Sequence, residues 1–191
     1  MPRTIEPDNA PRGNHWRPLI WGGAGCLLLL PLAAMQFTHE VDWTLSDFVV
    51  MGAMLAIACG TYELGAWISG DTVYRAAFGI AVLASFLLVW INLAVGVIGS
   101  ENNPANLMYA GVLAVGAIGA LVARFQPGGM SRALLATALA QLVVGAIALA
   151  AFDAELRVIV GVSAMFAVLW LASAGLFRMA ARDQRGMRAV G

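Results

Sequence analysis

The sequence predicts an all-α membrane protein, a bundle of six transmembrane helices with both termini in the cytoplasm. Of its 191 residues, 61% are hydrophobic and 12% are charged, whereas a soluble domain has about 45–50% apolar and about 25% charged residues. The mean hydropathy is +0.81. These values exclude an ordinary soluble enzyme, a disordered segment and a nucleic-acid-binding protein. They imply a chain that lies in a lipid bilayer.

Six stretches are long enough to cross that bilayer. A span needs about 20 mostly apolar residues, because the hydrocarbon core is about 30 Å thick and a helix rises about 1.5 Å per residue. The predicted spans are residues 19–35, 48–68, 76–98, 107–123, 133–152 and 158–177. Each is expected to be helical, since an open strand would leave its backbone groups unpaired in lipid. They form a membrane domain of residues 18–178 between a flexible tail, 1–17, and a basic tail, 179–191.

A basic segment that ends at Arg17 precedes the first span, as in a signal peptide. Residues 32–35 offer no small-x-small cleavage site, however, and five further spans follow, so we interpret it as a retained helix. Pro31 is expected to bend this helix because it removes one backbone hydrogen bond.

The arginines predict the orientation of the bundle, since basic residues gather on the cytoplasmic side of a membrane. With a cytoplasmic N-terminus, ten of the eleven arginines lie inside and Arg157 alone lies outside. The inner ten are Arg3, Arg12, Arg17, Arg75, Arg124, Arg132, Arg178, Arg182, Arg185 and Arg188. Both tails are then cytoplasmic.

The second span contains one carboxylate, Glu63, close to its cytoplasmic end. At about 100° per residue it shares a face with small residues such as Gly52 and Ala56, so it is expected to face another helix. Two hypotheses remain open. Glu63 is either a proton acceptor or cation ligand, or it pairs with an interfacial arginine, for which the candidates are Arg17, Arg75 and Arg132.

The third and fifth spans each carry one amide inside the bilayer, Asn92 and Gln141. Together with Glu63 they are candidates for a polar path from one side of the membrane to the other. The alternative is that both amides form hydrogen bonds between helices, worth about 0.6 kcal/mol each. We favour the alternative, because neither amide can titrate.

The fourth span is expected to be a helix with a face of small residues, formed by Gly116, Gly119 and Ala123. Small residues let helices approach closely in a membrane. Such faces favour association with a partner membrane protein or with a second copy of the chain.

An acidic cluster with one imidazole follows the first span on the outer side, formed by His39, Glu40, Asp42 and Asp47. These groups could hold a divalent cation or provide general acid–base chemistry. Their spacing matches no established metal signature, so we predict no metal site.

Enzymatic signatures are missing from the sequence. It contains no Walker A loop, GxGxxG turn, HExxH or GxSxG motif, and its two histidines, His15 and His39, lie outside the spans. We therefore predict no cofactor, exclude haem held by intramembrane histidines and incline against an enzyme.

Two segments resemble a group of uncharacterised bacterial multi-pass inner-membrane proteins with six helices. One is Ala34-Met-Gln-Phe-Thr-His-Glu-Val-Asp-Trp-Thr-Leu-Ser-Asp-Phe48, and the other runs from Asn92 through Asn102-Asn-Pro-Ala-Asn-Leu-Met-Tyr109. The resemblance implies a bacterial inner membrane and supplies no catalytic residues. It also implies that the outer loops at 36–47 and 101–106 are shared features. The asparagines around Pro104, which are Asn102, Asn103 and Asn106, predict a tight loop closed by hydrogen bonds of their side chains.

Three functions compete. We favour an accessory or structural membrane subunit that packs against a partner through small-residue faces. The first alternative is a small permease or ion-coupled carrier that uses Glu63. The second is an enzyme at the outer face that uses His39.

Overall fold

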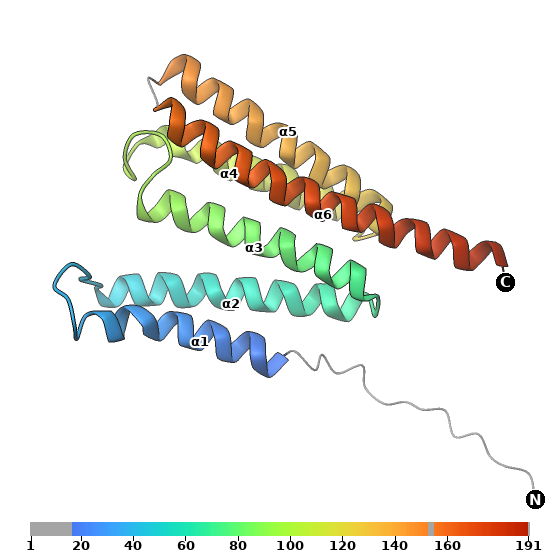
Figure 1. Ribbon diagram of the computed structural model, residues 1–191, viewed down its shortest axis with the longest axis horizontal. Coiled ribbons are helices and arrows are strands. Elements are labelled where there is room, and N and C mark those ends of the chain that lie inside the picture. Colours follow the sequence, from blue (N-terminus) through green and yellow to red (C-terminus); the bar gives the residue numbers. More distant parts are fainter. Residues whose placement is uncertain (1–16, 153–154, 191) are drawn as a thin grey trace, which may run out of the picture.

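The computed structural model describes residues 17–152 and 155–190 and confirms the all-α fold (Figure 1). Its helices are α1 (Arg17–Ala34), α2 (Leu45–Ile68), α3 (Thr72–Ala94), α4 (Met108–Val122), α5 (Pro127–Ala151) and α6 (Leu156–Val190). A short 3-10 helix, η1 (Pro104–Leu107), leads directly into α4. With η1 counted together with α4, all six are long and apolar enough to span a membrane. The protein is therefore an integral multi-pass membrane protein.

Successive helices run in opposite directions, so the start of α1 and the end of α6 lie at the same end of the bundle (Figure 1). We call this the arginine-rich end. The described arginines that the helix order puts there are Arg17, Arg75, Arg124, Arg132, Arg178, Arg182 and Arg185. Among the described arginines, Arg157 alone lies at the opposite end of the bundle, in the first turn of α6.

The end of α3 differs from the prediction. The predicted span continues to residue 98, but α3 ends at Ala94. Gly96 and Gly99 have φ angles of +73° and +75°, a conformation that glycine adopts without steric cost. A Cβ on Gly96 would collide with the backbone of Ser100. The chain therefore turns here, although its apolar residues continue.

The last two helices are longer than predicted. α5 begins at Pro127, before the predicted start at residue 133, because proline suits the first position of a helix. α6 continues to Val190, beyond the predicted end of the span at residue 177. The predicted basic tail is therefore a continuation of α6 as far as Val190 (Figure 1).

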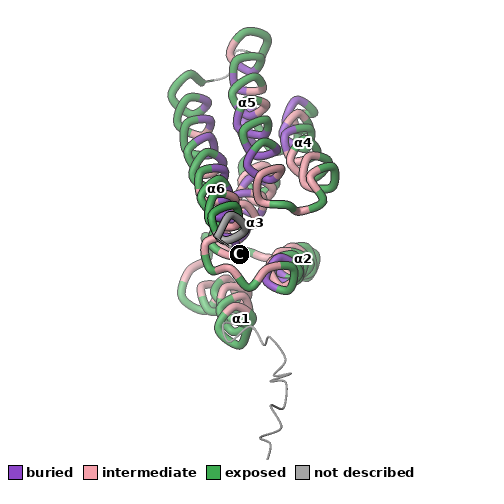
Figure 2. The backbone as a smooth tube through the Cα atoms, turned by 90° about the vertical axis from the view of Figure 1, so that its right-hand side faces the viewer, coloured by how far each residue is buried: buried purple, intermediate pink, exposed green. Residues whose placement is uncertain are grey.

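The main core lies among α3, α4, α5 and α6, where buried residues form facing stripes (Figure 2). α5 lies between α4 and α6 and approaches both closely through small residues. A Cβ on Gly119 of α4 would lie 2.7 Å from the Cβ of Ala133, and one on Gly145 of α5 would collide with Ser163 of α6. This close approach brings many atoms into van der Waals contact, which drives helix association in lipid.

The first two helices are attached more loosely. α1 has no buried residue. α2 packs on α3 through a small separate cluster of Met51, Leu55 and Phe86. The molecule is thus a tight bundle of α3–α6 with α2 and then α1 added on one side (Figure 2).

Side-chain hydrogen bonds to backbone carbonyls strengthen this arrangement. The Tyr74 hydroxyl donates to the carbonyl oxygen of Phe125 at 2.8 Å, and the Ser173 hydroxyl donates to that of Ala77 at 2.6 Å. These bonds connect α3 to the α4–α5 turn and to α6. Arg75 donates to the carbonyls of Ala66 and Ser69 and so caps the end of α2.

Asn106 organises the loop between α3 and α4. Its side-chain oxygen accepts hydrogen bonds from the backbone N–H groups of Val97 and Ile98 at 3.0 and 2.9 Å, and its amide donates to the carbonyl of Ser100. Val97 and Ile98 are buried. Asn103 caps the start of η1. The predicted loop closed by asparagine side chains is confirmed.

We expect Asn106→Ala to lower the free energy of unfolding by about 3 kcal/mol, because it leaves two backbone N–H groups without an acceptor in a buried loop. Equilibrium unfolding of the variant and the wild type in mixed detergent micelles measures the difference in free energy. The matched control is Asn102→Ala, since Asn102 is exposed and bonds only to its neighbour Glu101. A similar loss in both variants would contradict the role of Asn106.

Candidate functional site

Glu63 of α2 binds two side chains of α1. Its Oε1 atom lies 2.8 Å from Nε of Arg17 and accepts a hydrogen bond from Nε1 of Trp21 at 2.7 Å. The Arg17 side chain is 67% exposed and the Glu63 side chain 24%. The carboxylate therefore lies near the arginine-rich end, between the two most loosely packed helices.

This contact bears on the two hypotheses for Glu63. Of the three candidate arginines, Arg17 is the one that pairs with it, while Arg75 caps α2. The geometry favours a structural ion pair that holds α1 against α2. Sequence reasoning missed Trp21, although its position four residues after Arg17 on one helix face could have indicated it.

Gln141 and Asn92 lie elsewhere in the bundle. Gln141 of α5 is fully buried, and neither polar atom of its side chain has a hydrogen-bond partner among the described residues. Asn92 of α3 donates to the carbonyl of Leu88 in its own helix. Within residues 17–152 and 155–190, no hydrogen bond joins any two of Glu63, Gln141 and Asn92. The polar path stays a prediction, and in the described residues neither amide makes the hydrogen bond between helices that the alternative expects.

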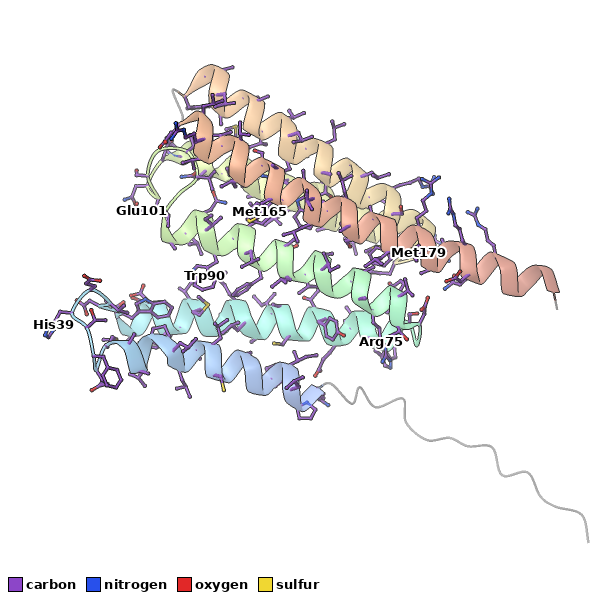
Figure 3. The ribbon with its side chains drawn as sticks, viewed as in Figure 1. His39, Arg75, Trp90, Glu101, Met165 and Met179 are labelled. Atoms are coloured by element: carbon purple, nitrogen blue, oxygen red, sulfur yellow. The ribbon has the colours of Figure 1, made fainter. Side chains whose placement is uncertain are left out.

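The acidic cluster is divided between the exposed loop that follows α1 and the first turn of α2. Asp47 forms a capping box with Thr44 at the start of α2, where its carboxylate accepts a hydrogen bond from the Thr44 N–H at 2.7 Å. His39, Glu40 and Asp42 are exposed, and His39 projects away from the bundle (Figure 3). The described part of the chain brings no three His, Cys, Asp or Glu side chains together around a possible metal position.

The small-residue face of α4 contacts α5 within the molecule. A Cβ on Gly116 would lie 3.1 Å from the Thr137 hydroxyl of α5, and Gly119 contacts Ala133. Ala123 contacts Gly129 at the start of α5. α5 therefore covers part of this face, while Gly116 also lines a cavity described below. Association through faces of small residues stays a prediction.

A cavity that sequence analysis did not foresee lies between α2 and α4. We call it the lateral groove, and it encloses about 540 Å³. α2 and α4 lie on the same side of the bundle and both pack on α3 (Figure 2). The groove is lined by Met54, Ile57, Ala58, Thr61, Phe78, Ala81, Val82, Ser85, Phe86, Val89, Leu113, Gly116, Ala117, Ala120, Leu121, Phe125, Met130, Leu134, Thr137 and Trp170.

The chemistry of the lateral groove is almost wholly apolar. No charged side chain lines it. The hydroxyls of Ser85 and Thr137 donate to carbonyls of their own helices. Ile57 and Leu121 are 69% and 65% exposed, whereas Trp170 is 2% exposed. The groove therefore suits an apolar ligand that arrives from the side, through the membrane, rather than a polar solute.

Comparison with known proteins identifies no family. No protein-family model matches the chain, and no curated protein or solved structure is significantly similar to it.

We expect a double-mutant cycle of Arg17→Gln and Glu63→Gln to give a coupling energy of about 0.5 kcal/mol, since water screens an ion pair this exposed. Added salt should reduce the coupling. Unfolding in micelles measures it. The matched cycle of Arg75→Gln with Glu63→Gln should give none, because Arg75 bonds to backbone carbonyls instead. Equal coupling in the two cycles would contradict the assigned pair.

We expect Gln141→Met to raise the free energy of unfolding by about 1 kcal/mol. A buried amide without partners carries a desolvation cost, and an apolar side chain of similar shape removes it. Thr137→Val on the same helix face is the control and should change stability little, since that hydroxyl bonds only within its helix. A destabilised Gln141→Met protein would show that the amide has polar partners in the membrane.

Proposed function

We propose that the protein is an accessory or structural membrane subunit whose lateral groove receives a transmembrane helix of a partner membrane protein. The observation that carries this proposal is the groove itself, an apolar cavity of about 540 Å³ between α2 and α4. The proposed location is a bacterial inner membrane with the arginine-rich end in the cytoplasm. The resemblance of two segments to bacterial inner-membrane proteins and the distribution of arginines support it.

Small residues in the lining support a helix as the occupant. Ala81 of α3 and Ala117 and Ala120 of α4 line the groove, and side chains of this size let a further helix approach the backbone closely. Helices in lipid associate through such packing, because the hydrocarbon is as apolar as the side chains and provides no hydrophobic driving force.

The two other hypotheses have less support. Glu63 pairs with Arg17, and none of Glu63, Gln141 and Asn92 lines the lateral groove, so no described cavity unites the residues that a carrier would use. An outer-face enzyme would need His39 beside two carboxylates in a cleft. His39 is exposed on a loop, and the described residues place no such group around it.

A groove-filling substitution tests the proposal. Ala117 is exposed and lines the groove, so Ala117→Trp should block it without disturbing the core. We expect the wild-type chain, extracted mildly from native membranes, to migrate in a complex heavier than its 20.0 kDa. The variant should migrate alone. Native electrophoresis followed by mass determination of the complex measures this.

The matched control is Ile118→Trp, because Ile118 is the next residue of α4, is 60% exposed and does not line the groove. It should keep the complex. A wild-type chain that migrates alone, a complex made only of this chain, or equal loss of the complex in both variants would overturn the proposal of a partner helix in the groove.

A further inference from the structure

The start of α5 and the last part of α6 lie side by side at the arginine-rich end (Figure 1). Residues of these two segments line a further cavity of about 760 Å³. We call it the arginine pocket. Four arginines line it, Arg132 from α5 and Arg178, Arg182 and Arg185 from α6. The first residues of α5 and Leu135 also line it. The pocket is separate from the lateral groove, which shares none of these residues.

The four arginines have no counter-charge in the described part of the protein. The ion pair there joins Arg17 to Glu63, and no described hydrogen bond involves any of the four. Asp183 lies beside Arg182 in the sequence but does not line the pocket. An anion bound among these guanidinium groups would therefore meet positive charge that no described acidic side chain neutralises.

Helical spacing makes this concentration of charge costly. Arg178 and Arg182 are four residues apart on α6, and Arg182 and Arg185 are three apart, so all three lie on one face of the helix. Like charges at these spacings destabilise a helix. Arg132 adds a fourth charge from the facing helix. An anion bound among the four arginines would attract each of them and so offset their mutual repulsion.

The start of α5 adds hydrogen-bond donors to the pocket. Pro127 has no N–H, and Gln126 makes no capping hydrogen bond with its side chain. The N–H groups of Gly128 and Gly129 thus remain at the positive end of the helix dipole. Gly128 faces α6, since a Cβ there would lie 4.0 Å from Nη2 of Arg185. Guanidinium groups and a helix start together suit a phosphate.

The apolar part of the pocket indicates where the phosphate comes from. Leu135 of α5 lines the pocket and is 46% exposed, one turn beyond Arg132 toward the middle of the membrane. A ligand in the pocket thus has charge beside it on one side and an apolar helix surface on the other. A phospholipid has the same sequence of groups, a phosphate followed by acyl chains.

We propose that the arginine pocket binds the phosphate group of an anionic phospholipid in the leaflet at the arginine-rich end. Basic pockets between transmembrane helices recognise such headgroups through charge. The four arginines and the first turn of α5 hold the phosphate, and the acyl chains lie along α5 beside Leu135. This inference does not depend on the partner helix proposed for the lateral groove.

Titration of the purified full-length chain with phosphatidylglycerol, followed by native mass spectrometry, tests the proposal. We expect the wild-type chain to bind phosphatidylglycerol in preference to zwitterionic phosphatidylcholine. The double variant Arg182→Gln/Arg185→Gln should bind phosphatidylglycerol about 30-fold more weakly, because two arginines at the membrane surface are lost. Both side chains are exposed, so the variant is expected to fold.

Arg157→Gln is the control, because it removes a positive charge at the opposite end of the bundle and should leave the affinity unchanged. Inorganic phosphate, titrated in the same way, separates a soluble ligand from a lipid. The proposal is overturned if the two lipids bind equally, if the double variant binds phosphatidylglycerol as tightly as the wild type, or if inorganic phosphate binds as tightly as the lipid.

Discussion

Hydrocarbon offers no hydrogen-bond partner, and this constraint organises the whole molecule. Helices satisfy their backbone groups internally, and several polar side chains inside the bundle bond to backbone carbonyls. Ser85 and Thr137 do so within their own helices, and Ser173 reaches from α6 to α3. At the end of the bundle opposite the arginine-rich end, where the chain leaves helical structure between α3 and α4, the side-chain oxygen of Asn106 accepts hydrogen bonds from two buried residues of the loop.

Close packing around α5 follows from the same constraint. Because lipid gives helices no hydrophobic reason to associate, their contact depends on van der Waals packing, and glycine gives the closest approach. Gly119 and Gly145 are located where α5 meets α4 and α6. In α1, a Cβ added to Gly22, Gly23 or Gly25 would have no atom of another helix within 4 Å. Glycine therefore allows close packing where α5 meets α4 and α6, whereas the glycines of α1 make no such contact.

The uneven packing of the helices accounts for the lateral groove and the arginine pocket. The lateral groove forms because α2 and α4 each pack on α3 and stand apart on one side. The arginine pocket forms because α6 continues past the start of α5. The first cavity is apolar and opens toward lipid, and the second is basic and lies at the arginine-rich end. Their chemistries suit different ligands, which is why the proposals made for them are independent.

The sequence by itself determined the number and type of the helices and the end at which the arginines gather, because span length and charge placement depend on the bilayer alone. It also indicated the asparagine-closed loop, since those bonds are local. Only the tertiary structure decided that Glu63 pairs with Arg17, that Gly116 and Gly119 pack against α5, and where the cavities lie. Those features depend on which helix lies beside which, and apolar stretches of similar composition do not specify their neighbours.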